Sequence, residues 1–115
     1  MRKDRRFHTY ILASSSGTLY IGVTNNIRKR VWQHKQGEIS GFTKQYAVDR
    51  LVHFESFDDI RTALNREKQL KGWVRAKKIW LIERENPSWL DLSRAWFESS
   101  GPSTPPLRGS AQDDK

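Results

Sequence analysis

Two tyrosines lie in neighbouring stretches rich in aromatic and β-branched residues, Tyr10 in FHTYIL and Tyr20 in TLYIGV. The segment ASSSG separates them, which predicts a β-hairpin with a loop over residues 13–17. In that register Tyr10 lies directly across from Tyr20, and two phenols share one patch of the sheet. Gly22 has the same strand parity, and a strand glycine often marks a close approach by a ligand or another backbone. Paired tyrosines also stabilise sheets, so the pattern alone leaves both roles open.

Arg30 and His34 are four residues apart in the stretch that follows, beside an apolar stripe that contains Ile27 and Val31. A guanidinium held in place on such a helix can bind a phosphate through two parallel hydrogen bonds. The alternative is an ordinary solvated run of basic residues, because Arg30 follows two other cations.

Glu67 is the least expected residue of the segment 60–74, because it falls in the middle of a stripe with helical spacing that we expect to face inward. A carboxylate in such a place needs a cation, hydrogen bonds or a metal ion, since burying an unpaired charge is costly. One alternative is an ion pair with a nearby base; the other is a single ligand for Mg²⁺, which binds one or two carboxylates and completes its shell with water and substrate oxygens. The apolar members of the stripe are Ile60, Ala63, Leu64, Leu70 and Val74.

Several other kinds of site have no support in the sequence. The chain has no cysteine, which excludes disulfides, thiolate zinc sites and cysteine nucleophiles. The three histidines show no zinc-ligand spacing, and the scattered glycines form no phosphate-binding loop. The five tryptophans fall mostly in helical stretches, where we expect them to pack in the core rather than stack on bases.

The elements that must position these residues follow from pattern and capping signals. A third strand is expected over residues 49–55, and helices over 27–36, 58–71 and 75–84, with a short last helix near 90–97. Asn25 and Asn26 are suited to cap the first helix, and Ser56 with Asp59 fits a capping box for the second. An initial hairpin followed by helices predicts an α+β domain: a small three-stranded antiparallel sheet flanked by helices.

The chain of 115 residues has a net charge of +8, which favours a polyanionic partner, with nucleic acid ahead of a membrane surface. Residues 61–78 carry seven basic side chains and one acidic one, and this band is expected to hold a nucleic-acid backbone. Residues 99–115 contain three of the four prolines and no charge bias, so we predict one domain over residues 1–98 and a disordered tail. Without a long apolar segment, a cytoplasmic protein is expected. The candidate nucleic-acid ligands are Lys44, Arg66, Lys68, Lys71, Arg75, Lys77 and Lys78.

Four blocks occur in order, and together they resemble the GIY-YIG nuclease superfamily, in particular its small stand-alone prokaryotic branch. The blocks are TYI, LYIGVTNN, IRKRVWQHK and ALNREKQLKGWVRAKKIWLIERENPSW. The first departs from the family name, because Thr9 stands where glycine would be. The resemblance covers about residues 7–92 and implies a three-stranded antiparallel sheet with flanking helices, and cleavage of DNA phosphodiester bonds that depends on a divalent metal.

What the resemblance implies for the site can be stated residue by residue. The tyrosines of the two name motifs are Tyr10 and Tyr20, the active-site arginine is Arg30, the helix histidine is His34 and the metal-binding residue is Glu67. In the mechanism we expect, Glu67 holds Mg²⁺ or Mn²⁺ and Arg30 neutralises phosphoryl charge. Tyr20 accepts the proton of the attacking water and Tyr10 positions water or substrate, while Lys44 or His34 are alternatives for the base.

The expected function is therefore a structure-selective DNA endonuclease acting in repair or recombination, with DNA as partner. One alternative is a nucleic-acid-binding module on the same fold that does not cleave, or that cleaves only with a partner. Another is a basic structural protein in which Glu67 forms only an ion pair.

Overall fold

A computed structural model describes residues 6–38, 41 and 45–98 of the chain. The elements run β1 (Phe7–Ala13), β2 (Leu19–Thr24), α1 (Ile27–Lys35), β3 (Arg50–Phe57), α3 (Ile60–Gly72), α4 (Arg75–Glu85) and α5 (Arg94–Glu98). The predicted elements are all present, with ends that differ by a few residues. The expected tail and Lys44 lie outside the described residues, so the proposed domain boundary stays a prediction.

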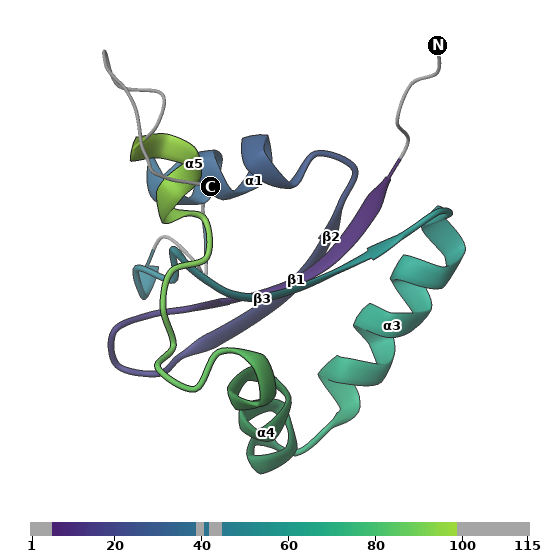
Figure 1. The fold of residues 1–115 in the computed structure, drawn as a ribbon. Coiled ribbons are helices and arrows are strands. Elements are labelled where there is room, and N and C mark those ends of the chain that lie inside the picture. Colours follow the sequence, from purple (N-terminus) through teal and green to yellow (C-terminus); the bar gives the residue numbers. More distant parts are fainter. Residues whose placement is uncertain (1–5, 39–40, 42–44, 99–115) are drawn as a thin grey trace, which may run out of the picture.

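The three strands form one antiparallel sheet in the order β2-β1-β3, with β1 in the centre. Helices α1 and α5 lie over one face of this sheet, and α3 and α4 lie over the other (Figure 1). The side chains of β1 alternate between the two layers, since Tyr10 packs in the core of the α1 face and Ile11 in the core of the α3 and α4 face. The α+β architecture is thus as predicted.

The predicted hairpin register is wrong by two residues. Tyr10 pairs with Gly22, and Tyr20 pairs with Leu12 rather than with Tyr10. The cause is the loop, in which the Ser14 hydroxyl accepts hydrogen bonds from the backbone N–H groups of Ser16 and Thr18, at 3.2 and 3.0 Å. The preceding alanine therefore stays in β1. A shift of two preserves strand parity, so the tyrosines still share one face.

Two side chains set the starts of α1 and α3. The Asn26 side chain accepts a hydrogen bond from the Lys29 N–H at 3.1 Å, which confirms the predicted cap of α1. The capping box of α3 is wrong, because Ser56 is still paired in β3. Asp59 is itself the N-cap residue and accepts from the Thr62 N–H at 2.8 Å.

The predicted inward stripe of α3 is only partly buried. Ala63 and Leu70 are fully buried, but Ile60 and Leu64 are exposed. Val74 is 71% exposed, because α3 ends at Gly72 and helical spacing no longer applies beyond it. The expectation that the tryptophans pack in the core also fails in part, since the side chains of Trp32 and Trp80 are exposed.

Candidate active site

Tyr10 is the centre of a polar cluster beneath α1. It comes from the middle strand and is fully buried. Its ring crosses Gly22 of β2 so closely that a Cβ on that residue would lie 2.7 Å from the Tyr10 hydroxyl and 2.8 Å from Cζ. This is the close approach that a strand glycine indicates, and the group that approaches is a side chain of the site.

Tyr20 and His34 complete a group of three rings around Tyr10. Ring centroids are 6.3 Å apart for the two tyrosines, 6.1 Å for Tyr10 and His34, and 5.4 Å for Tyr20 and His34. The Tyr10 hydroxyl lies 3.3 Å from Nε2 of His34, within hydrogen-bond distance. His34 is buried on the inner side of α1, whereas Tyr20 is only partly buried.

Arg30 lies one turn before His34 on α1, and its positive charge lowers the pKa values of both His34 and Tyr10. Burial, helped by the Arg30 charge, lowers the pKa of His34 to about 4, so its imidazole is neutral at pH 7. Burial, and after it the nearby Tyr20, raises the pKa of Tyr10 to about 12. Arg30 has the opposite and smaller effect, because a cation favours the ionised phenol. Tyr10 is therefore a neutral phenol. We assign its proton to the bond with Nε2 of His34, which leaves its oxygen to accept from Arg30.

Glu67 approaches this cluster from α3, in the layer on the other side of the sheet (Figure 1). Its carboxylate is close enough to raise the pKa of Tyr10, which links it electrostatically to the group beneath α1. The side chain is 19% exposed, and Oε2 forms an ion pair with Nζ of Lys71 at 3.0 Å. The Lys71 side chain is 55% exposed, so displacing it would cost only about 0.5 kcal/mol.

The donor set around Glu67 suits only one kind of metal site. Among the described residues no group of three or more His, Cys, Asp or Glu side chains could enclose an ion. A single partly buried carboxylate fits Mg²⁺ or Mn²⁺ that keeps several waters and takes further oxygens from a phosphate. It does not fit a structural zinc site.

The predicted basic band is exposed only in part. Lys44 lies outside the described residues, and Lys78 is half-buried. Arg66 forms hydrogen bonds at 2.8 and 3.0 Å to both carboxylate oxygens of Glu55, so its guanidinium is engaged within the protein, and its role as a nucleic-acid ligand stays a prediction. The exposed members of the band are Arg61, Lys68, Lys71, Arg75 and Lys77.

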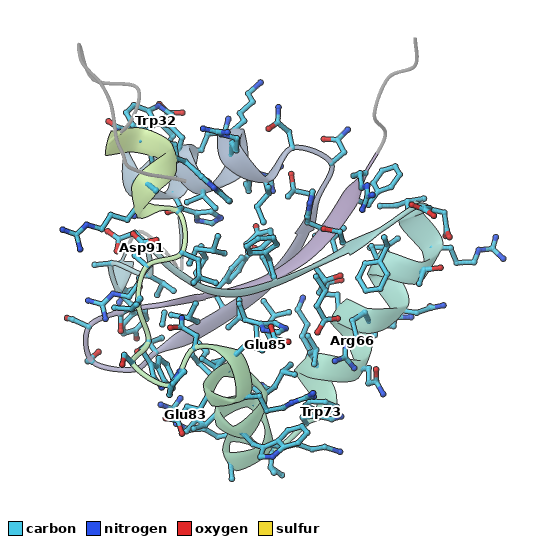
Figure 2. The ribbon with its side chains drawn as sticks, in the orientation of Figure 1. Trp32, Arg66, Trp73, Glu83, Glu85 and Asp91 are labelled. Carbon is cyan, nitrogen blue, oxygen red and sulfur yellow. The ribbon has the colours of Figure 1, made fainter. Side chains whose placement is uncertain are left out.

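The partner of Arg66 belongs to a network that the sequence did not lead us to expect. His53 Nε2 lies 2.8 Å from Glu55 Oε2, and the Arg66 guanidinium lies 5.2 Å from the ring of Trp73, beside which it is drawn in Figure 2. Burial alone would raise the pKa of Glu55, but its bonds to His53 and Arg66 outweigh burial and lower it to about 2. The signal in the sequence is the alternation of His53 and Glu55 on one face of a strand.

Comparison with known proteins agrees with this arrangement. Residues 6–79 match the GIY-YIG catalytic domain, a range that includes all five candidate catalytic residues. The chain is 40% identical over 76 residues to a UPF0213 protein of Haloquadratum walsbyi, covering 66% of this chain and 85% of that protein. It is 42% identical over 81 residues to a UPF0213 protein of Syntrophus aciditrophicus, covering 70% of this chain and 92% of that protein.

The solution NMR structure of a UPF0213 protein from Bacillus halodurans has the same fold, with a TM-score of 0.50 and 23% identity over 86% of this chain and 99% of that chain. Within the described residues no helix is long and apolar enough to cross a bilayer. The match to the catalytic domain extends from the start of β1 into α4 and so includes every element that carries a candidate catalytic side chain. The chain therefore belongs to the GIY-YIG family, whose catalytic domain is that of a nuclease.

Proposed function

We propose that this chain is a DNA endonuclease that depends on a divalent metal and hydrolyses phosphodiester bonds. The observation that carries the proposal is the convergence at one buried hydroxyl: Tyr10 bonds to His34 and lies in the fields of Arg30 and Glu67. A cation, phenols and a carboxylate in one place suit a reaction in which negative charge builds on a phosphate.

The chain's own side chains have separable roles. Arg30 neutralises charge on the phosphoryl oxygens, and it lies near enough to Tyr10 for its charge to lower the pKa of that phenol. Tyr10 has a pKa of about 12 and acts as a donor or positioning group rather than a base. His34 holds the Tyr10 hydroxyl and is a positioning residue, which makes it a poor alternative for the base.

The proton of the attacking water is assigned to Tyr20, which is partly exposed and can meet solvent. Water attacks phosphorus and passes its proton to the Tyr20 oxygen, whose own phenolic proton goes to solvent. The bond from phosphorus to the leaving oxygen breaks, and that oxygen takes a proton from solvent. Glu67 would hold Mg²⁺ or Mn²⁺, which when bound supplies Lewis-acid stabilisation of the phosphate. A role in DNA repair or recombination, in the cytoplasm, is part of the proposal.

The first test is cleavage of labelled single-stranded, duplex, splayed and branched DNA with Mg²⁺ or Mn²⁺. We expect Glu67→Gln and Arg30→Ala to lose at least about 100-fold in rate while DNA binding persists. Matched controls are Glu85→Gln and Lys29→Ala, which remove the same charges at exposed positions of α4 and α1. Cleavage that survives both site substitutions would overturn the assignment.

A second candidate function is a binding module that does not cleave. The ion pair between Lys71 and Glu67 favours it, because the carboxylate then needs no metal ion. This alternative would be supported if the wild-type chain bound DNA in a salt-sensitive way and cut none of these substrates.

A further inference from the structure

Trp80 is an exposed aromatic residue on the solvent side of α4. The residue is 53% exposed, whereas Ile82, two residues on and therefore about 200° around the helix, is fully buried. Large aromatic side chains bring most of their stabilising area when they are buried, so this tryptophan contributes little to the core. Its exposure calls for an explanation outside the folding of the chain.

Cations flank Trp80 along the same face of the helix. Arg84 lies one turn after it, with Cζ 5.1 Å from the centre of the Trp80 ring. Lys77 lies one turn before it, with Nζ 4.3 Å from the ring of Trp73. Both cationic residues are exposed, and we call Lys77, Trp80 and Arg84 the α4 stripe. Its members span about 10 Å of helix.

The acidic residues of α4 do not neutralise this stripe. Glu83 accepts a hydrogen bond from the indole N–H of Trp89 at 2.8 Å, which directs its carboxylate to that ring. Glu85 lies about 140° around the helix from Trp80. An indole between two cations therefore faces solvent, and a polyanion that also offers flat rings complements it.

We propose that the α4 stripe is a stacking platform for unpaired bases of single-stranded DNA. A base stacks on the indole or continues the stack over the Arg84 guanidinium, while Lys77 binds the phosphate backbone. A duplex hides its base faces within the helical stack and offers the stripe only phosphates. The stripe thereby favours DNA with a single-stranded segment over a continuous duplex.

This inference deepens the proposed function by naming the form of the substrate, and it rests on that function only for the link to cleavage. Glu67 and the stripe belong to helices of the same layer, and α4 begins three residues after α3 ends. Lys71 is exposed one turn beyond Glu67, between Glu67 and the stripe in the sequence. A strand that reaches Glu67 can therefore continue past Lys71 toward Trp80.

The test is fluorescence anisotropy with a labelled 16-nucleotide oligothymidylate and with a 16-base-pair duplex, both in EDTA so that no metal-dependent cleavage occurs. We expect Trp80→Ala to weaken binding of the single strand at least about fivefold and binding of the duplex less than twofold. Its salt dependence should stay as in the wild type, because no charge is removed. Trp80→Phe should restore most of the affinity, since it keeps a stacking face.

Trp32→Ala is the matched control, because Trp32 is also exposed but lies on α1, across the sheet from Trp73 and α4 (Figure 2). Circular dichroism melts report whether each variant folds. Equal loss of single-strand and duplex binding, or no loss, overturns the platform. It is also overturned if Trp80→Ala converts a dimer into a monomer without changing DNA affinity, which would assign the surface to a second copy.

The two proposals can fail separately. If Trp80→Ala loses selective binding but the wild-type chain cuts no DNA with metal, the platform stands and the nuclease function falls. If the wild-type chain cuts DNA and Trp80→Ala binds single strands normally, the nuclease function stands and the platform falls.

Discussion

Replacing Gly22 with alanine tests whether the site depends on where the Tyr10 ring lies. The new Cβ would lie 2.8 Å from Cζ of Tyr10, about 0.7 Å inside the separation at which carbon atoms pack well. It would also lie 3.2 Å from Cε2 of Tyr20. Tyr10 is fully buried, so its ring cannot yield into solvent.

The expected magnitude follows from what the ring must give up. If the Tyr10 hydroxyl moves about 0.7 Å away from His34, their 3.3 Å separation stretches beyond hydrogen-bond range. A buried polar group without a partner costs about 1–3 kcal/mol, and overpacking costs about as much. The movement that breaks the hydrogen bond also relieves part of the overpacking, so the two costs do not add in full. We therefore expect a loss of about 2–4 kcal/mol in the free energy of unfolding. Misplacing a positioned group by about 1 Å can also lower the rate about 100-fold.

Urea denaturation measures the stability, and single-turnover cleavage of labelled DNA with Mg²⁺ measures the rate. Gly72→Ala is the matched control, because a Cβ at that position meets no atom within 4 Å. The reasoning fails if Gly22→Ala is as stable as Gly72→Ala. Lower stability with an undiminished rate of the folded fraction would show that the position of Tyr10 does not matter for cleavage.

Three further outcomes are expected. Folding lowers the pKa of Glu55 from about 4.5 to about 2, so the stability that its carboxylate contributes is complete above about pH 5 and is lost as the pH falls toward 2. Because the Glu55 side chain is 24% exposed, solvent screening leaves this contribution at about 2 kcal/mol. Urea melts of Glu55→Gln should lack that part of the pH dependence, and a slope like the wild type would refute the network. Mg²⁺ should raise the melting temperature of the wild type but not of Glu67→Gln, and equal shifts in calorimetry would remove Glu67 as a ligand. Replacing both Lys77 and Lys78 with alanine should reduce the slope of log affinity for duplex DNA against log salt by about 0.9 for each phosphate that is no longer neutralised; an unchanged slope removes both from the interface.

Local chemistry along the chain was enough to predict the elements and which candidate side chains share a face. Strand patterns, the Asn26 cap and the breaks between helices depend on neighbours in sequence, and the structure confirms them. The parity of Tyr10, Tyr20 and Gly22, together with the four-residue spacing of Arg30 and His34, indicated which side chains could share a face. These relations are periodic, so they survive an error in the loop.

The sequence by itself determined which side chains are available for chemistry and on which elements they lie, because helix and strand periods are properties of a single segment. Only the tertiary structure decided their partners. Glu55 of β3 engaged Arg66 of α3, and Tyr10 of β1 met His34 of α1. It also left Trp80 in solvent, because a three-stranded sheet covers only one side of α4. Each of these outcomes depends on which segments meet across the fold, and a helical or strand period carries no such information.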